Sequence, residues 1–322
     1  MRDTVVETPK VWWAELFPSE FKSRLEQCPI VYMPLGLCEP HGQISAFGLD
    51  TFKAEHLCRR TAETIGGIVA PTMGYHVHEV GPSAKFLEDN VGEHNPHMTS
   101  VPSFIFYHMY LYQLRSFHNA GFQHAVILSG HGGAHLHDLQ KITKLFMERV
   151  NMRIWYGTDF ELTRGTFAGD HAGKYEISAL MHLRPDLVDM SKKRLESVPG
   201  AGGRLAVGPD AEEASAEYGE QIVLACEAAL ARIASELHQH TKPANADEDF
   251  VPLSIELIES IWQDIVKSAE NRTEHWATLQ PRDGQQPVSE HSRWKPHERV
   301  QMQYRGKPKQ AACGGMCKTC KS

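Results

Sequence analysis

Two carboxylates and an imidazole follow the first long apolar run of the chain. After the run 29–35, Glu39, His41 and Asp50 come within twelve residues, among several glycines. Glu39 and His41 are two residues apart, so in a locally extended chain their side chains point to the same side. Such mixed oxygen and nitrogen donors suit a divalent metal ion. The structural alternative is that Asp50 caps a helix starting at Thr51, while Glu39 and His41 are ordinary loop residues.

A second candidate ligand, His131, lies in the sequence Gly-His-Gly-Gly at 130–133. The apolar run 124–129 precedes it and a helical pattern follows it, so His131 is expected at the end of a buried strand. A glycine-rich turn that opens a helix can instead bind an anion through its backbone N–H groups. The sequence contains no GxGxxG fingerprint and no Walker lysine, which favours the metal interpretation.

A third polar stretch, 169–178, contains Asp170, His171 and Glu176. If a helix begins at residue 174, Glu176 lies in its first turn, where a carboxylate also complements the helix dipole. Asp170 could be a cap of the same helix. The structural and the chemical interpretations of this stretch therefore both stay open.

The elements that must position these groups alternate between two types. Apolar runs of strand length lie at 29–35, 67–72, 124–129 and 152–157. Segments with helical spacing lie at 51–65, 101–120, 134–149, 174–184 and 211–238. This alternation predicts an α/β fold with a mainly parallel sheet covered by helices on both faces. Ligands of such sheets bind beyond the carboxyl ends of the strands, where the polar stretches lie.

Composition narrows the classes of protein. The chain has 322 residues, a net charge of −7 and the apolar content of a soluble globular protein. It has no run near the ~18 apolar residues of a membrane span, so we expect a cytoplasmic protein without a membrane partner. Eight basic residues and one acid in 293–322 leave −14 on residues 1–292, and an acidic body argues against nucleic acid as a partner.

The three polar stretches, in this order, resemble the motifs of the creatininase (creatinine amidohydrolase) family. Its Gly-x-x-Glu-x-His-Gly motif with a following aspartate, its Gly-His-Gly-Gly motif and its His-Ala-Gly-x-x-Glu-Thr-Ser motif are matched at 36–50, 130–133 and 171–178. The resemblance spans roughly residues 10–240. It implies a creatininase-like three-layer fold, a hydrolase acting on non-peptide C–N bonds, two divalent metal ions and often a hexameric assembly.

The ligand set that the resemblance implies consists of Glu39, His41, Asp50, His131 and Glu176. Three carboxylates and two imidazoles suit Zn²⁺, Mn²⁺ or Fe²⁺, and Asp50 is the candidate bridge between two ions. The chain departs from the family pattern at Gly133, which replaces a glutamate of creatininase itself, at Ala134, which replaces an asparagine, and at Ile177, which replaces a threonine. These departures argue against creatinine itself as the substrate.

The expected reaction is hydrolysis of a small cyclic or linear non-peptide amide, such as a creatinine-like lactam or a formamide. Two metal ions would activate a shared water as hydroxide and polarise the substrate carbonyl. The leaving nitrogen needs a proton, and His171 is the candidate donor because imidazole titrates near neutral pH. Asp170 is the candidate for orienting His171.

A histidine-rich stretch between the motifs, 74–99, is expected to line the substrate pocket because long loops in compact domains are usually functional or disordered. The predicted substrate-binding residues are Tyr75, His76, His78, Gly132 and Gly133. For single histidines the alternative is an inert surface position, and for Tyr75 it is burial in the core.

The domain organisation has three parts. We expect a metal-dependent hydrolase domain over 1–240, a linker with an extra helix over 241–270 and a polar, basic tail over 271–322. Cys28, Cys38, Cys58 and Cys226 are scattered and are interpreted as reduced thiols. The remaining three cysteines crowd the tail as Cys313, Cys317 and Cys320.

The tail cysteines suggest a second function class. Their C-x₃-C-x₂-C spacing suits a zinc ion or an Fe–S cluster, and the alternative is a flexible tail of exposed thiols. In the alternative function, a binding or redox module, this cluster would be the working part and the body a scaffold. A scaffold has no need of the five ligands named above, which favours the hydrolase.

A homo-oligomer is expected, a hexamer by resemblance. The residues 255–265 place apolar side chains at helical spacing after a polar linker, so this face needs a cover, which the sequence suggests is another subunit. The basic tail and the acidic body would also attract each other between chains.

Overall fold

The sheet of this protein is parallel throughout. The computed structural model describes residues 9–78, 98–196, 208–242 and 250–280. Its strands are β1 (Ile30–Leu35), β2 (Ile68–Val69), β3 (His124–Ser129) and β4 (Arg153–Thr158), in the spatial order β2-β1-β3-β4. The register pairs Leu35 with Ser129 and Ser129 with Thr158, so β1, β3 and β4 end at the same edge.

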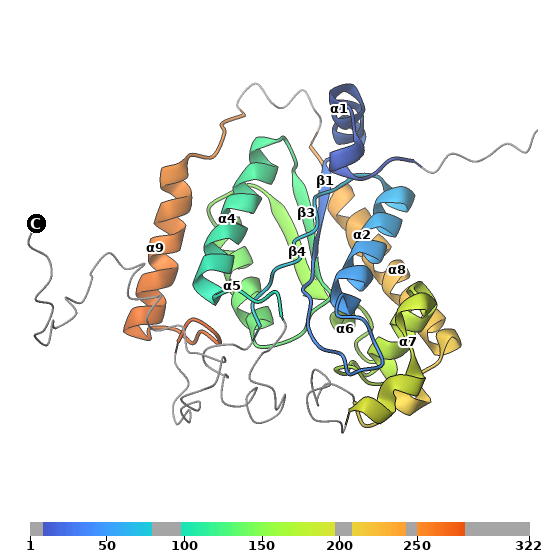
Figure 1. Ribbon diagram of the computed structural model, residues 1–322. Helices are drawn as coiled ribbons and strands as arrows, with labels where there is room; N and C mark the ends of the chain where they lie inside the picture. Colours follow the sequence, from blue (N-terminus) through green and yellow to red (C-terminus); the bar gives the residue numbers. More distant parts are fainter. Residues whose placement is uncertain (1–8, 79–97, 197–207, 243–249, 281–322) are drawn as a thin grey trace, which may run out of the picture.

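Helices cover both faces of this sheet, giving three layers (Figure 1). On one face lie α4 (Ser103–Asn119) and α5 (His135–Met147), with α9 (Ile255–Asn271) packed on them. On the other lie α2 (Leu49–Ile65), α7 (Lys174–Leu183) and α8 (Ala216–His238). The other helices of the described residues are α1 (Pro18–Gln27), the one-turn α6 (Asp159–Leu162) and the 3₁₀ helices Trp13–Glu15, Pro185–Leu187, Met190–Leu195 and Ala211–Glu213.

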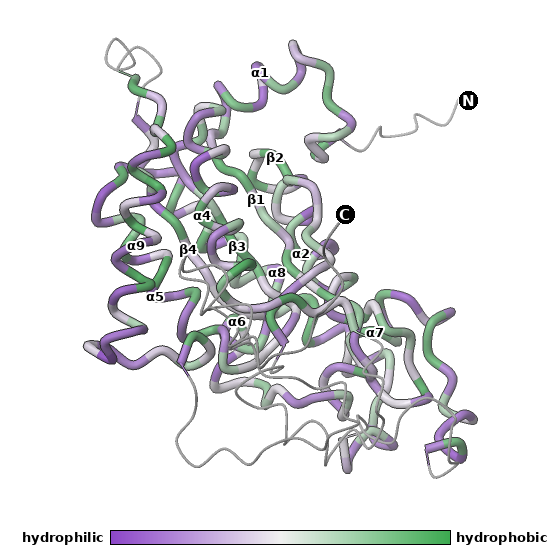
Figure 2. The backbone as a smooth tube through the Cα atoms, turned by 60° about the vertical axis from the view of Figure 1, so that its left-hand side comes forward, coloured by the Kyte–Doolittle hydropathy of each residue, from purple (hydrophilic) through white to green (hydrophobic). Residues whose placement is uncertain are grey.

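Alternation along the strands divides the core between the two faces. On β1, Val31 and Met33 pack in the cluster that contains α4, α5 and α9, while Ile30 and Tyr32 pack in the cluster of α2 and α8. Every residue of β1 and β3 is buried, as expected for a sheet covered on both sides. Figure 2 shows these two strands as mainly hydrophobic segments inside the molecule, between helices with hydrophilic outer faces.

The predicted α/β fold is confirmed. Each predicted strand is present, although β2 is only two residues long, and each predicted helix is present with boundaries shifted by a few residues. The sequence interpretation did not include α1 and α6. In the described parts of the chain, no helix is long and apolar enough to cross a membrane. Cys28, Cys38, Cys58 and Cys226 are free thiols, as predicted.

The expected cover of the last helix was wrong. The apolar face of α9 is covered by α4 and α5 of the same chain and not by another subunit. Its buried residues are Ile258, Ile261, Trp262 and Ile265. His108 of α4 stacks on Trp262, with ring centroids 4.9 Å apart. The apolar face of α9 therefore gives no support for an oligomer.

The chain also stays packed beyond residue 271, where the sequence suggested little to pack. Trp276 and Leu279 are buried in the same cluster as α9. The carboxylate of Asp138 on α5 accepts hydrogen bonds from the backbone N–H groups of Ala277 and Thr278, both at 2.7 Å. The body thus extends to residue 280, and Cys313, Cys317 and Cys320 lie outside the described residues.

Candidate metal centre

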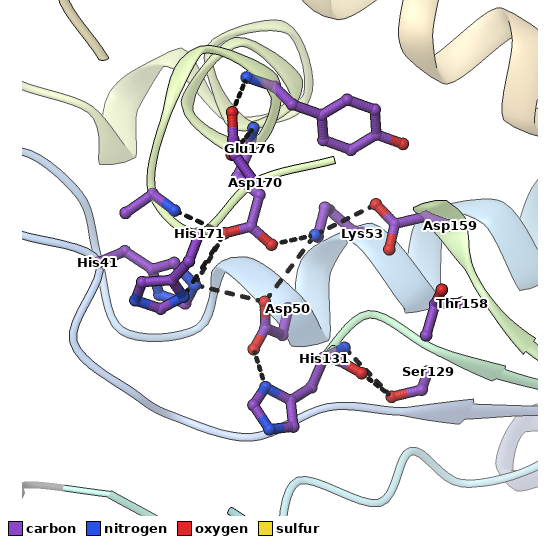
Figure 3. Close-up of polar contacts among 12 residues, drawn as sticks. His41, Asp50, Lys53, Ser129, His131, Thr158, Asp159, Asp170, His171 and Glu176 are labelled. Atoms are coloured by element: carbon purple, nitrogen blue, oxygen red, sulfur yellow. Dashed lines mark hydrogen bonds and ion pairs between the residues drawn. The ribbon is translucent and has the colours of Figure 1, made fainter. Parts of the chain in front are cut away.

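The three polar motifs meet at the carboxyl edge of the sheet. The loop after β1 supplies Glu39 and His41, the turn after β3 supplies His131, and the first turn of α7 supplies Glu176. All of these side chains are buried, as is Asp50 in the first turn of α2. Figure 3 shows His41, Asp50, His131 and Glu176 converging from these elements.

Glycines allow the first turn of α2 to approach the strands closely. A Cβ atom on Gly130 would lie 2.0 Å from the carbonyl oxygen of Asp50, and one on Gly36 would lie 2.5 Å from Cα of Thr51. No side chain fits in either place. The glycines that follow β1 and β3 therefore bring Asp50 within reach of the residues at the ends of both strands.

The carboxylate of Asp50 lies between two imidazoles. Its Oδ1 is 3.4 Å from Nε2 of His41, and its Oδ2 is 3.4 Å from Nδ1 of His131. Neither oxygen has a hydrogen-bond partner of good geometry among the described residues. Buried polar atoms normally have such partners, so this pair of oxygens fits a site that holds cations.

The ring of His41 is oriented for ligation. Its Nδ1 is 3.1 Å from the backbone carbonyl of Glu39, which accepts a hydrogen bond when Nδ1 is protonated. This hydrogen bond leaves Nε2 facing Asp50 and Glu176, with Oε2 of Glu176 at 3.4 Å. Histidine ligands of metals commonly donate their other ring N–H in this way.

A second group of donors surrounds Glu39. Its Oε1 is 2.9 Å from Nδ1 of His131, and its Oε2 is 2.8 Å from Nε2 of His78. His78 was predicted to bind substrate, but its ring nitrogen, the Glu39 carboxylate and His131 form one cluster whose donor atoms all lie within 4.8 Å of one another. A similar cluster contains His41, Asp50 and Glu176. The site thus has two neighbouring donor groups, and Asp50 reaches toward both.

The electrostatic field of the site favours positive charge. Burial lowers the pKa of His131, but Glu39 and Asp50 outweigh burial and raise that pKa to about 10. Burial raises the pKa of Glu39, but His131 and His78 outweigh it and hold that pKa well below its usual value. A field that keeps buried imidazoles positive also attracts a divalent cation.

Two charged residues that the sequence interpretation missed belong to the same network. Lys53 is buried, and its Nζ lies 2.7 Å from Oε1 of Glu176, 3.2 Å from Oδ2 of Asp159 and 3.9 Å from Oδ1 of Asp50 (Figure 3). Asp159 directly follows β4, so the sequence could have placed it at the same edge of the sheet as the predicted ligands. Lys53 lies one helical turn after Asp50, a spacing that puts both side chains on one face of α2.

His171 lies at the rim of the site. Its side chain is 48% exposed, its ring centroid is 4.8 Å from that of His41, and its Nδ1 is 4.0 Å from Oε2 of Glu176. Geometry alone leaves it two roles, because Glu39, His41 and His171 also form a cluster of donor type. Partial exposure suits a group that exchanges protons with substrate or solvent.

Asp170 has the hydrogen bonds of a helix cap. Its carboxylate oxygens accept backbone N–H groups of Gly173 at 3.1 Å, Tyr175 at 2.7 Å and Glu176 at 3.3 Å. In the described part of the chain, no hydrogen bond or ion pair joins it to His171. The contacts are those of the capping alternative, and they fix the first turn of α7, which carries Glu176.

The other predicted substrate-binding residues are spread out. Tyr75 is 60% exposed, whereas His76 is fully buried, with its ring stacked on Phe106 at 4.5 Å between centroids. Burial lowers the pKa of His76 well below its usual value. His76 thus packs in the core beside the site, with its ring centroid 5.5 Å from that of His131, and its contact with substrate stays a prediction. Gly132 lies against the ring of Phe160, and Gly133 has a positive φ of 145°.

Fold and site together describe a three-layer α/β protein with a buried carboxylate and imidazole centre at the carboxyl edge of its sheet. Comparison with known proteins adds a family. The model of the creatininase family, described as creatinine amidohydrolase, matches residues 14–234, more than half of the chain. The chain therefore belongs to the creatininase family, and the predicted family resemblance is confirmed.

Individual relatives are distant. A creatinine amidohydrolase of Pseudomonas putida is 26% identical over 204 residues, covering 56% of this chain and 75% of the relative. A 3-dehydro-scyllo-inosose hydrolase of Thermotoga maritima is 27% identical over 155 residues, and the match spans 45% of each chain. A crystal structure of creatininase superposes with a TM-score of 0.57 at 21% identity, covering 72% of this chain and 99% of the other.

Proposed function

We propose that this protein is a dinuclear metal-dependent amidohydrolase that cleaves a C–N bond in a small cyclic or linear non-peptide amide. The observation that carries the proposal is the carboxylate of Asp50, whose two oxygens face His41 and His131, each at 3.4 Å. A carboxylate in this position can contact two ions at once. Two-metal hydrolytic sites hold their ions ~3.5 to 4 Å apart, a separation that one carboxylate spans.

The donors divide into two groups. His41, Asp50 and Glu176 would hold one ion, and Glu39, His78 and His131 would hold the other, with Asp50 shared. Mixed nitrogen and oxygen donors suit Zn²⁺, Mn²⁺ or Fe²⁺. Related creatininase structures are described as a manganese form and as a Zn-Zn type, which supports the same choice here. When bound, such ions lower the pKa of water and polarise a substrate carbonyl.

The protein's own residues supply the proton transfer. An amide nitrogen leaves only after protonation, and His171 is the candidate donor because it is half-exposed and lies beside His41. Asp170 acts on the site through the start of α7, since its carboxylate accepts the backbone N–H of Glu176. The partly buried ring of Phe160 lies beside Lys53 at this site.

The substrate class follows from the family and from the departures within its motifs. Another creatininase structure is described as complexed with creatine, which supports a small polar amide or its hydrolysis product as the ligand class. Gly133, Ala134 and Ile177 depart from the motifs of creatininase itself, so we propose a lactam or formamide other than creatinine. A second candidate is a cyclic ketone of the inosose type, which is favoured by the match with the inosose hydrolase.

Metal analysis tests the proposal most directly. A full-length protein carrying Cys313→Ser, Cys317→Ser and Cys320→Ser removes the tail thiols, so any metal that remains belongs to the body. We expect about two transition-metal ions per chain in this variant, because the site has two donor groups. Loss of all metal with the tail cysteines would instead support the binding or redox module. Assays on a panel of lactams, formamides and inososes then separate the substrate classes.

We also propose a homo-oligomer. The apolar face of α9 gives no support, because it is covered within its own chain. The support that remains is the family resemblance and the opposite charges of tail and body. Light scattering at low and high salt tests this assembly. A full-length protein that stays monomeric at micromolar concentration would contradict it.

A further inference from the structure

We propose that Lys53 is a positioning residue that holds one oxygen of Glu176 away from the metal ion and so keeps a coordination position open for water or substrate. The inference rests on the proposed function, because it concerns the ion held by His41, Asp50 and Glu176. It assigns a role to a buried lysine that none of the three motifs contains.

Lys53 is held by compensating charge on several sides. Its side chain is 3% exposed, and a buried ammonium is costly unless it is paired. Oε1 of Glu176 lies 2.7 Å from Nζ, and Oδ2 of Asp159 lies 3.2 Å from it. The ring of Phe160 lies 4.9 Å from Nζ on another side. These contacts fix the ammonium between α2, α6 and α7.

The contact with Lys53 gives the two carboxylate oxygens of Glu176 different partners. Oε1 pairs with Lys53 at 2.7 Å. Oε2 accepts the backbone N–H of Ala172 at 2.9 Å and lies 3.4 Å from Nε2 of His41. Only Oε2 therefore faces the other donors of this group. A carboxylate can bind a cation through one or both oxygens, and here the ion pair withholds the second.

Asp159 acts as the second anchor of the ammonium. It begins α6, directly after β4, where Oγ1 of Thr158 accepts the backbone N–H of Glu161 at 3.3 Å. A capped helix start directly after the sheet strand β4 is a rigid place for this carboxylate. Because Asp159 holds Lys53 from the side of β4, the ammonium is kept at the position where it reaches Glu176.

An open position follows from the donor count. With Glu176 restricted to one oxygen, this group offers one atom each from His41, Asp50 and Glu176. Catalytic sites typically combine three protein ligands with an open position, whereas structural sites are closed. Lys53 thus favours the catalytic arrangement, and without it the second oxygen of Glu176 is free to close the site.

Relaxation of water protons by bound Mn²⁺ tests this role, because it reports how much water exchanges at the ion. We expect Lys53→Met, loaded with Mn²⁺ to the level of the wild type, to lose part of the relaxation enhancement per bound ion. Asp159→Asn is the matched control, because the amide oxygen of asparagine can still accept a hydrogen bond from Nζ and so keep Lys53 against Glu176. We expect its enhancement to equal that of the wild type.

A folding defect does not hide the result. If Lys53→Met alone does not fold, the double variant Lys53→Met with Asp159→Asn removes a cation and an acid together and leaves one fewer carboxylate unpaired. It should show the same loss. Equal enhancement in wild type and in the Lys53 variants at equal loading overturns the inference alone, as does an equal loss in Asp159→Asn. A wild type that binds no Mn²⁺, Zn²⁺ or Fe²⁺ overturns the proposed function and this inference with it.

Discussion

Asp50 presents one carboxylate oxygen to His41 and the other to His131, at 3.4 Å in both cases. The two imidazoles come from the ends of adjacent strands, and Asp50 comes from the helix that begins between them. This relationship depends on Gly130, where any side chain would collide with the backbone of Asp50. A single carboxylate thus reaches both donor groups.

Replacement of Asp50 by asparagine should therefore reduce the metal content of the body from about two ions to one or fewer. The substitution keeps the size of the side chain and removes the charge that both donor groups share. Elemental analysis of the variant without tail cysteines measures the result, with Glu227→Gln on α8 as a control outside the site. Full loading of the Asp50 variant would show that Asp50 is not shared.

Replacement of His78 is expected to affect metal binding, and replacement of His171 is expected to affect proton transfer. His78→Ala should lose about one ion, because Nε2 of His78 lies 2.8 Å from Glu39 within a buried donor group. His171→Ala should retain its ions while the rate of hydrolysis falls by roughly 10² to 10⁴, the usual contribution of general acid–base catalysis. Metal content and turnover of both variants are measured together. Loss of metal from the His171 variant would make His171 a ligand instead.

Asp138 is expected to hold the segment that follows α9. Its carboxylate accepts two backbone N–H groups and the hydroxyl of Thr278 in a buried place. Asp138→Asn replaces an acceptor oxygen by an amide donor, so the free energy of unfolding should fall by about 2 to 4 kcal/mol. Urea denaturation measures this fall. The exposed pair of Asp264 with Arg149 supplies the control, because Asp264→Asn should change stability by less than ~1 kcal/mol.

His124 should make stability depend on pH on the acidic side of neutrality. Burial, together with the nearby Arg153, His238 and His240, lowers its pKa from the ordinary 6.5 to about 4. The folded state then binds fewer protons than the unfolded state. The contribution of His124 to the free energy of unfolding is therefore fully present above pH 6.5 and is lost as the pH drops toward 4.

We expect His124→Gln to flatten this dependence. Between pH ~7 and ~5 the wild type should lose roughly 1 kcal/mol more of its free energy of unfolding than the variant, after allowance for partial solvent screening. Glutamine keeps a polar group that can reach the hydroxyl of Thr241, which lies 3.3 Å from Nε2 of His124. Parallel pH profiles for the two proteins, measured by urea denaturation, would assign the dependence to other groups.

The sequence by itself determined the fold class and most of the candidate donor set. Strand and helix patterns have different periods, and the carboxyl ends of parallel strands must share one edge. Motifs that follow β1 and β3 were therefore bound to meet, whatever the details of packing. The same reasoning could have included Asp159, because it follows β4 in the same way.

Only the tertiary structure decided which side chains complete the network and which cover the helices. Lys53 and Glu176 are 123 positions apart, and no local pattern says that an ammonium and a carboxylate so distant will meet in the interior. The periodicity of α9 showed that it has an apolar face, but an apolar face is satisfied equally by its own chain or by another. Burial is a property of packed elements, so His76 in the core and His78 beside Glu39 could be told apart only once those elements were in place.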